Sequence, residues 1–405
     1  MWADRCFNYD RIMRDPYQLG DRASITVRSA VSVGIVALAV AMGIGRFAFT
    51  PLLPLMIRDH VIDGPTGAEW AAANYLGYLV GALTTRRMNR QLKRNLSFAL
   101  LGVAVSTASV AFIHTSLAGA ALRFVAGILS AWVLVLASSL CLATLAREGM
   151  GHLGAWIYTG VGIGITLAGV LTWLGGEQSA WLLWLELGAL AAVGTVHVVK
   201  AIPHISDDSM GSVPCGSAPV RGDTGLIISY GTFGFGYIVP ATFLPALAHV
   251  QVKNPLVFGL TWPIFGIAAA VSVAIVARLL STVRRRRVWA MAQGLMALGT
   301  ALPVFSQRLG SLTLSAMLVG GTFMVTTMAG LQLARELAPA NPTPLLARMT
   351  AAFAAGQIAG PLLVRLIPVQ RAQPWGGLIF ASALAAVLLA GTAIWLWRSD
   401  LRRRR

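Results

Sequence analysis

Charged residues are scarce in this sequence of 405 residues. They make up 12% of the chain, about half of the ~25% that is usual in soluble domains, whereas 56% of the residues are hydrophobic. A chain of this composition has too little polar surface to cover one water-soluble core. The sequence therefore excludes a soluble globular domain and predicts an all-α integral membrane protein.

Cysteine is equally rare, because the chain holds only Cys6, Cys141 and Cys215. These three residues lie far apart and form no Cys-x-x-Cys pair, so neither a disulfide framework nor a zinc site is indicated. The other potential metal ligands lack a defined spacing: His197, His204, Asp207 and Asp208. We therefore predict no metal site.

Enzyme signatures are missing as well. The sequence contains no GxxxxGK[ST] phosphate loop, no HExxH helix and no GxSxG elbow. We therefore predict no enzyme, no cofactor and no ATP-driven pump. The net charge of +17 would fit a nucleic-acid-binding protein, but the basic residues fall between apolar runs and form no soluble basic face. We expect no nucleic-acid partner and attribute the positive charge to membrane topology.

Long apolar runs are what this chain has in abundance. A bilayer core of ~30 Å needs about 20 helical residues, and twelve stretches reach that length. We place these spans near residues 31–57, 67–85, 95–114, 116–146, 152–174, 179–199, 224–247, 255–279, 286–306, 310–334, 345–367 and 375–397. The first run is too long for a signal peptide, so we interpret it as an uncleaved helix.

The basic residues between these spans predict the orientation. With both termini in the cytoplasm, the inner segments hold 25 Lys and Arg and the outer segments hold five. Such an excess on one side follows the positive-inside rule. We therefore predict cytoplasmic termini and an even number of spans.

The segment at 201–225 is polar and rich in Gly, Ser, Pro and Asp, which is typical of a flexible linker. It divides the chain into a cytoplasmic tail (1–24), a six-helix bundle (25–199), a cytoplasmic linker (200–223), a second six-helix bundle (224–398) and a basic tail (399–405).

The two halves also repeat a pattern of small residues and prolines. Repeated halves are typical of transporters, whereas glycine spacing alone is equally typical of close helix packing. The residues of this pattern are Gly45, Pro51 and Pro54 with Gly160 and Gly164 in the first half, and Gly234 and Pro240 with Gly356, Gly360 and Pro361 in the second.

Four stretches carry a family resemblance: "GIGRFAFTPLLPLM" (43–56), "NYLGYLVGAL" (74–83), "GFGYIVPATFLPALA" (234–248) and "GQIAGPLL" (356–363). Through them the chain resembles the major facilitator superfamily (MFS) and, within it, the YbfB/YjiJ-type branch. The resemblance implies two pseudo-symmetric six-helix bundles that rock about a central cavity lined mainly by spans one, four, seven and ten. It also implies a monomer in a bacterial inner membrane that moves a small solute.

Departures from the superfamily's motifs limit what carries over. "RFVAG" (123–127) resembles the fourth-helix motif, whose arginine is implicated in proton coupling. "GVGIGITLAG" (160–169) resembles the fifth-helix motif of exporters, but Ile165 stands where the proline would be. In the loop "GALTTRRMNRQLKR" from Gly81, Thr85 replaces the acidic residue and Met88 the glycine of the gating motif. The direction of transport therefore stays open.

Ionisable residues inside membrane spans are expensive and mark candidate functional sites. The spans hold two arginines, Arg46 and Arg123, and one carboxylate well inside, Glu186. At ~1.5 Å per residue, Arg46 lies about 15 Å and the other two about 10 Å from the outer ends of their spans. Two cations against one carboxylate favour an anionic or carboxylate-bearing solute, with Glu186 as the best candidate for proton coupling. Alternatively, one arginine pairs with Glu186 and the other caps carbonyls at a helix break produced by Pro51.

Further candidates for solute contact lie on polar helix faces: Asn74 and Tyr78 in span two, Tyr230 and Tyr237 in span seven, and Gln357 in span eleven. Packing of polar groups between helices would produce the same pattern. Trp and Tyr side chains near span ends are expected to be interface anchors.

Together these features predict a secondary active transporter of a small solute that works by alternating access, with protons as the coupling ion. A membrane sensor or scaffold on a transporter fold is the alternative from another class; it would bind a ligand without net flux. A membrane-embedded enzyme and a channel fit the sequence less well.

Overall fold

The computed structural model describes residues 16–88, 91–113, 115–204, 223–251, 260–280, 282–338, 343–366 and 376–402. The predictions for the first residues of the tail, most of the linker and the end of the basic tail lie outside these residues. So do Cys6, Cys215, Asp207 and Asp208, together with the side chain of His204.

The described chain is all helical, as predicted. Its first half contains α2 (Pro16–Leu38), the π-helix η1 (Ala39–Ile44), α3 (Phe49–Arg58), α4 (Gly64–Met88), α5 (Leu92–Ser109), η3 (Val110–Phe112), α6 (Ser116–Arg147), η4 (Gly151–Tyr158), α7 (Thr159–Leu174), α8 (Ala180–Ala201) and η5 (Ile202–His204). Its second half contains α9 (Asp223–Gln251), α11 (Thr261–Leu279), α12 (Arg285–Phe305), α13 (Leu309–Leu337), α14 (Thr343–Leu366) and α15 (Gly376–Arg402).

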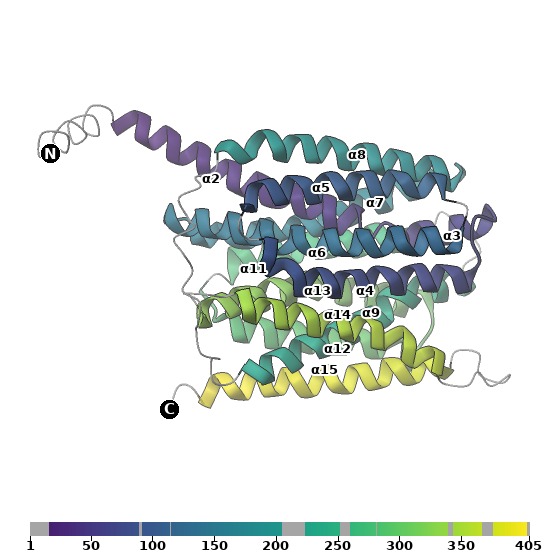
Figure 1. Cartoon of the computed structure of the whole chain (residues 1–405). Coiled ribbons are helices and arrows are strands. Elements are labelled where there is room, and N and C mark those ends of the chain that lie inside the picture. The colour runs from purple at the N-terminus through teal and green to yellow at the C-terminus, as the bar shows by residue number, and fades with distance from the viewer. Residues whose placement is uncertain are drawn as a thin grey trace, which may run out of the picture.

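These elements correspond to the twelve predicted spans, with α2, η1 and α3 forming the first. The helix α2 begins at Pro16, well before the predicted start of that span, so helix already forms within the segment interpreted as a tail. Nine helical segments of the described residues are long and apolar enough to cross a membrane. The start of α2 and the end of α15 lie at the same end of the bundle, as an even number of crossings requires (Figure 1).

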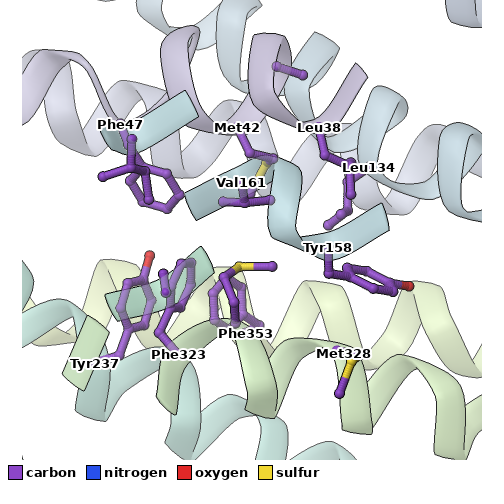
Figure 2. Close-up of a cluster of buried hydrophobic side chains, with 14 of the residues drawn as sticks. Leu38, Met42, Phe47, Leu134, Tyr158, Val161, Tyr237, Phe323, Met328 and Phe353 are labelled. Carbon is purple, nitrogen blue, oxygen red and sulfur yellow. The ribbon is translucent and has the colours of Figure 1, made fainter. Parts of the chain in front are cut away.

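The two halves of the chain stack on each other along two helix pairs. In the first half α4 packs on α6 and α5 on α8, and in the second half α9 packs on α14 and α12 on α13 and α15. Between the halves, α7 packs along α11 and α4 along α14 (Figure 1). Side chains from η1, α6 and α7, including Met42, Leu134 and Val161, face Tyr237, Phe323 and neighbouring rings of the second half in an apolar layer (Figure 2).

Glycine allows α7 to approach the first span closely. A Cβ atom at Gly160 would lie 2.0 Å from the carbonyl oxygen of Ile35, and one at Gly164 would lie 2.3 Å from that of Ala39. Both distances are too short for any side chain, so these two positions accept only glycine without a shift of backbone. Their spacing therefore serves close packing between the first and fifth spans.

The second half uses glycine at the equivalent crossing, between α9 and α14. A Cβ at Gly234 would lie 2.2 Å from the carbonyl oxygen of Phe353, and one at Gly356 would lie 2.2 Å from that of Gly231. These four glycines thus serve the same contact in each half: span one on span five, and span seven on span eleven. Gly45, by contrast, faces Val103 of α5. Both α9 and α14 stay helical through their prolines, Pro240 and Pro361.

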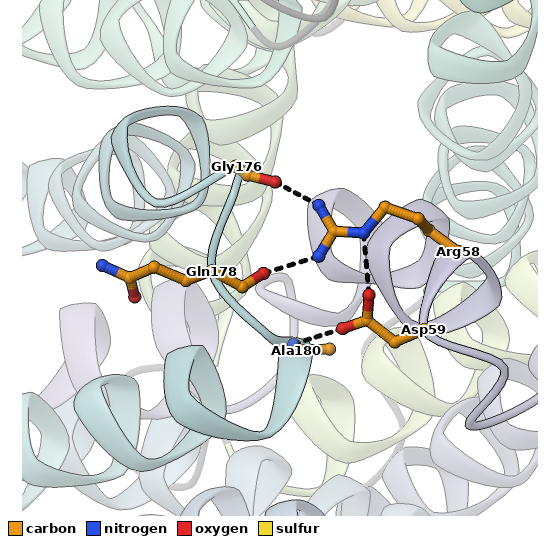
Figure 3. A network of polar contacts seen from close by, with 5 residues as sticks. All are labelled: Arg58, Asp59, Gly176, Gln178 and Ala180. Atoms are coloured by element: carbon orange, nitrogen blue, oxygen red, sulfur yellow. Dashed lines mark hydrogen bonds and ion pairs between the residues drawn. The ribbon is translucent and has the colours of Figure 1, made fainter.

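At the outer end of the first half, Arg58 and Asp59 tie α3 to the turn between α7 and α8 (Figure 3). Arg58 donates to the carbonyl oxygens of Gly176 and Gln178, while Asp59 accepts from Arg58 Nε at 2.7 Å and from the Ala180 backbone N–H at 2.6 Å. The charges match the helix dipoles, since the cation lies at the end of α7 and the anion at the start of α8. The hydrogen bond from Arg58, assisted by that from Ala180, holds the pKa of Asp59 below its ordinary value of 3.8.

Candidate functional site

The first span is interrupted beside Arg46. In the π-helix η1 and the turn after it, the N–H groups of Gly45 and Phe47 reach back five residues, to Val40 and Met42. Because regular α-helix resumes only at Phe49, the carbonyl groups of Gly45 and Arg46 point away from the helical ladder. Carbonyls freed in this way need donors from elsewhere when they are buried.

The expected break at Pro51 is not observed. Pro51 lies in the first turn of α3, where a backbone N–H has no helical acceptor in any case, so a proline there costs nothing. The interruption instead precedes it and includes Arg46 itself. Pro54 lies inside α3, which continues to Arg58.

Arg123, on α6, supplies the missing donors. Its Nη1 donates to the carbonyl oxygen of Gly45 and its Nη2 to that of Arg46, both at 3.0 Å. Its guanidinium also lies 4.9 Å from the ring centre of Phe49, and the backbone carbonyl of Arg123 accepts from Asn74 Nδ2 at 2.9 Å. Of the two arginines predicted within the spans, Arg46 and Arg123, Arg123 is therefore the one that caps carbonyls at the helix break.

Arg46 reaches across to the second half of the chain. Its side chain is buried, and its Nη2 donates to Gln357 Oε1 on α14, while Gln357 Nε2 donates to the hydroxyl of Tyr237 on α9. The guanidinium carbon lies 3.8 Å from the ring centre of Tyr78, a close cation–π contact. Arg46 Nε and Nη1 have no hydrogen-bond partner among the described residues.

Both arginines border a small cavity between the two halves. Its wall comes from the first span, α4, α6, α9 and α11, and consists of Arg46, Phe47, Phe49, Thr50, Ala71, Asn74, Tyr75, Arg123, Ile238, Ala241, Thr242 and Trp262. The cavity volume is about 20 Å³, which is room for about one water molecule. In this conformation the site is thus closed around a space smaller than any organic solute.

Unpaired polar atoms in this wall are mostly donors. Trp262 Nε1 and Arg123 Nε lack partners within the described chain, as do the two nitrogens of Arg46, whereas the one unpaired acceptor of the wall is Asn74 Oδ1. No carboxylate of a described residue lies within 4 Å of either arginine. Because unpaired buried donors and uncompensated cations are costly, such a wall favours an anion with several acceptor oxygens.

Two predicted site residues lie elsewhere. Glu186 is half-buried on α8, a helix that packs on α5 and α2, and it forms no ion pair within the described part of the chain. Tyr230 packs among aromatic rings of its own half, with its ring centre 5.4 Å from that of Phe233 and 5.7 Å from that of Trp289. Neither residue belongs to the cavity wall.

Other residues of the wall were missed. Trp262 lies inside the predicted span 255–279 and at the observed start of α11. It is buried against the cavity because that end of α11 faces the first half of the chain. Tyr75 follows Asn74 directly, and Thr50 follows the break. Tyr75 and Thr50 could have been found from the sequence, because each lies within four residues of a predicted site residue. The sequence contains no comparable indication for Trp262 and Thr242.

The predicted lining by spans one, four, seven and ten holds only in part. Spans two and eight contribute through α4 and α11, and α13, the tenth span, contributes no described residue to the wall. Phe323 of α13 instead packs edge-on against Phe47, with ring centres 5.6 Å apart.

This architecture is the fold of the major facilitator superfamily (MFS). The human organic anion transporter MFSD10 (TETRAN) is similar at 16% identity, with a TM-score of 0.66 over 92% of this chain and 99% of that one. The nucleoside transporter NupG is similar at 16% identity and a TM-score of 0.65 (91% and 99%), and a D-xylose-proton symporter at 12% identity and 0.69 (91% and 97%). At these identities the likeness shows the fold alone.

The sequence identifies the family more narrowly. Residues 38–396 match the family described as uncharacterised MFS-type transporter YbfB, and the chain belongs to that family. A comparison with curated proteins found no match. The chain is therefore a multi-pass membrane transporter of a small molecule and not an enzyme, as its sequence predicts.

Proposed function

We propose that this transporter carries a small organic anion, and that the carboxylate of that anion binds Arg46. The observation that carries the proposal is the pair of unpaired nitrogens on a buried arginine with no carboxylate partner among the described residues. An arginine offers a carboxylate two pairs of parallel N–H groups, Nε with Nη2 and Nη1 with Nη2, and in Arg46 each pair joins one free nitrogen to the Nη2 that is bonded to Gln357. Trp262 Nε1 supplies a further donor, and aromatic rings provide the apolar part of the wall.

The geometry around Arg46 also supports alternating access. The chain of hydrogen bonds from Arg46 through Gln357 to Tyr237 connects the two halves beside the cavity. A carboxylate that engages Arg46 competes with Gln357 for the same guanidinium, so binding weakens a contact that joins the halves. Rocking of one half against the other then widens the closed cavity to one side or the other.

An ion gradient drives the cycle in this proposal, with protons as the coupling ion. Moving one negative charge inward against the membrane potential costs about 2.3 kcal/mol per 100 mV, and an accompanying proton removes that cost. No described residue of the cavity wall is a carboxylate, so in this proposal the substrate's own carboxylate takes up the proton when it leaves Arg46. We place the protein in a bacterial inner membrane as a monomer.

Transport in proteoliposomes tests the proposal. The purified protein is first screened for thermal stabilisation by acetate, succinate and benzoate, with xylose and uridine as neutral controls. Flux of the stabilising compound is then measured with an imposed pH gradient and, separately, with a sodium gradient. We expect carboxylate flux that follows the pH gradient.

Other outcomes contradict parts of the proposal. Flux of a neutral solute in place of the carboxylates would remove the anion assignment, and flux indifferent to both gradients would remove the coupling. Stabilisation without net flux would favour a sensor on a transporter fold.

A further inference from the structure

A half-buried arginine, Arg335, lies in the interface between the two halves, at the end predicted to face the cytoplasm. Arg335, near the end of α13, donates from Nη2 to the Ser139 hydroxyl on α6 at 3.3 Å. Arg335 is one of the 25 Lys and Arg that the predicted topology assigns to the inner segments. In the structure it instead bridges the two halves, beside a cavity of about 10 Å³ whose wall includes Ser138, Tyr158 and Arg335.

The polar atoms around this inner cavity are incompletely paired. Tyr158 is fully buried and Ser138 nearly so, and their hydroxyl groups are neighbours. Neither hydroxyl group has a hydrogen-bond partner with good geometry among the described residues. Arg335 Nε also has no partner among the described residues. A guanidinium and two hydroxyl groups all donate, so this cavity, like the outer one, offers donors to an anion.

Other arginines at the same end do have carboxylate partners. Arg287 Nε lies 2.8 Å from Asp400, and Arg285 Nε lies 3.7 Å from Glu336. Glu336 is the neighbour of Arg335 in sequence, yet it pairs with α12. No carboxylate of a described residue lies within 4 Å of Arg335.

An apolar layer separates the inner cavity from the outer one. Figure 2 shows Phe47, beside the outer cavity, at one end of this layer, and Leu134 and Tyr158, which line the inner cavity, at the other. Phe323, Phe353 and Met42 lie between them (Figure 2). An anion that leaves Arg46 toward the cytoplasm therefore meets no other described cation along this layer before Arg335.

We propose that Arg335, with Ser138 and Tyr158, forms a second anion-binding site, which receives the substrate carboxylate on the cytoplasmic side. The proposal rests on the proposed transport of an organic anion. While the inner end is closed, Arg335 donates to Ser139 and holds α13 against α6. When the halves part there, the same guanidinium becomes free to bind the carboxylate and the two hydroxyl groups become accessible to it.

Site-directed labelling tests this second site. Val135 also lines the inner cavity and is not one of the proposed ligands, so V135C serves as the reporter in a chain whose three native cysteines are replaced by serine. A membrane-impermeant maleimide is applied to inside-out vesicles with increasing benzoate or benzenesulfonate, the latter being charged at every pH used. We expect the anions to slow labelling, and R335Q to raise the half-protecting concentration about tenfold or more, as loss of a charge-assisted hydrogen bond does.

Two further variants separate binding from closure. S139A removes the contact between the halves but keeps the charge, so labelling should become faster while protection by the anion remains. If R335Q behaves like S139A, or if the anions give no protection in the parent reporter, the second site is refuted and Arg335 is a closing contact only. In the V135C background, R46Q should still allow the anions to protect V135C from labelling. Loss of the outer site at Arg46 and absence of an inner site at Arg335 therefore give different results.

Discussion

The outer rim of the first half and the buried cavity between the two halves each contain arginine, and they use it in opposite ways. At the rim, Arg58 is 42% exposed and its guanidinium donates to Asp59 and to two backbone carbonyls (Figure 3). Twelve residues earlier along the same span, Arg46 is 3% exposed, and two of its nitrogens have no partner within the described chain. The buried arginine, which is the more costly of the two to desolvate, thus has fewer hydrogen-bond partners than the exposed one.

This contrast separates structure from function. An arginine that only stabilises the fold finds its full set of acceptors, as Arg58 does and as Arg123 nearly does. A buried cation that keeps free donors beside a cavity is destabilising by about 1–3 kcal/mol per unpaired group. Such a cost is expected where the missing acceptor is a ligand, and the predictions below test the contrast in order of effect.

The largest effect is expected for R46Q. Glutamine keeps an amide that can still bond to Gln357, but it removes the charge and the paired N–H groups that bind a carboxylate. We expect the ratio of maximal rate to KM for anion transport to fall by about ten- to a hundredfold. Initial rates of anion uptake into proteoliposomes measure this ratio.

The matched control is R58Q at the rim. It removes the same charge from the same span and should lower thermal stability while leaving KM for the anion unchanged. If R46Q and R58Q lose the same fraction of transport activity per amount of folded protein, then Arg46 has no role in transport that Arg58 lacks.

A smaller effect is expected for W262F, which deletes one neutral donor from the cavity wall and keeps an aromatic ring. We expect the apparent affinity for the anion to fall about tenfold, because a hydrogen bond to a charged acceptor is lost. W70F is the control, since Trp70 Nε1 donates to the Ser116 carbonyl at 3.0 Å outside this cavity. Isothermal titration of both variants distinguishes them; an unchanged affinity in W262F contradicts its assignment to the site.

D59N should change stability and not transport. The charge of Asp59 is bound to Arg58 and to the start of α8, so its loss should cost about 1 kcal/mol near neutral pH. Because the pKa of Asp59 is lower in the folded protein, this stabilisation is fully present above its ordinary value of 3.8 and disappears as pH falls through the lower, folded-state value. Thermal unfolding as a function of pH measures this: the gap between wild type and D59N should be constant near neutrality and close in acid.

The fold was predictable for two reasons. The length of an apolar run indicates whether a helix can cross the lipid bilayer, and the basic residues in the loops indicate which side of the membrane each loop faces. The boundaries of α6, predicted at 116–146 and observed at Ser116–Arg147, illustrate how sharply lipid selects composition. The π-helix at Ala39–Ile44 was not predictable in the same way. It depends on where Arg123 of another helix can satisfy the freed carbonyls, and that is a tertiary property.

The site residues that were predicted are of types that are rare within membrane spans, and those that were missed are of types that are common there. Arg46 stands out because arginine is so costly within a membrane span, and Gln357 because it accompanies a family motif. Trp262 resembles any tryptophan near a span end, and only the packing of α11 on α7 shows that it faces protein. Arg335 was counted as a topology signal because the sequence does not reveal that α13 brings it against α6.

The smallest effect on transport is expected for E186Q. An unchanged transport rate in this variant would support a substrate that carries the proton itself. Glu186 lies on a helix that packs on α5 and α2, and it does not line the cavity, so no described contact leads from this carboxylate to the arginines. If the substrate carries the proton, E186Q should transport at the wild-type rate with the same dependence on pH. Uptake measured at about pH 6 and pH 8 in wild type and E186Q compares these dependences. A flat pH profile in the variant would instead make Glu186 the proton site, and coupling would then act through α8 at a distance from Arg46.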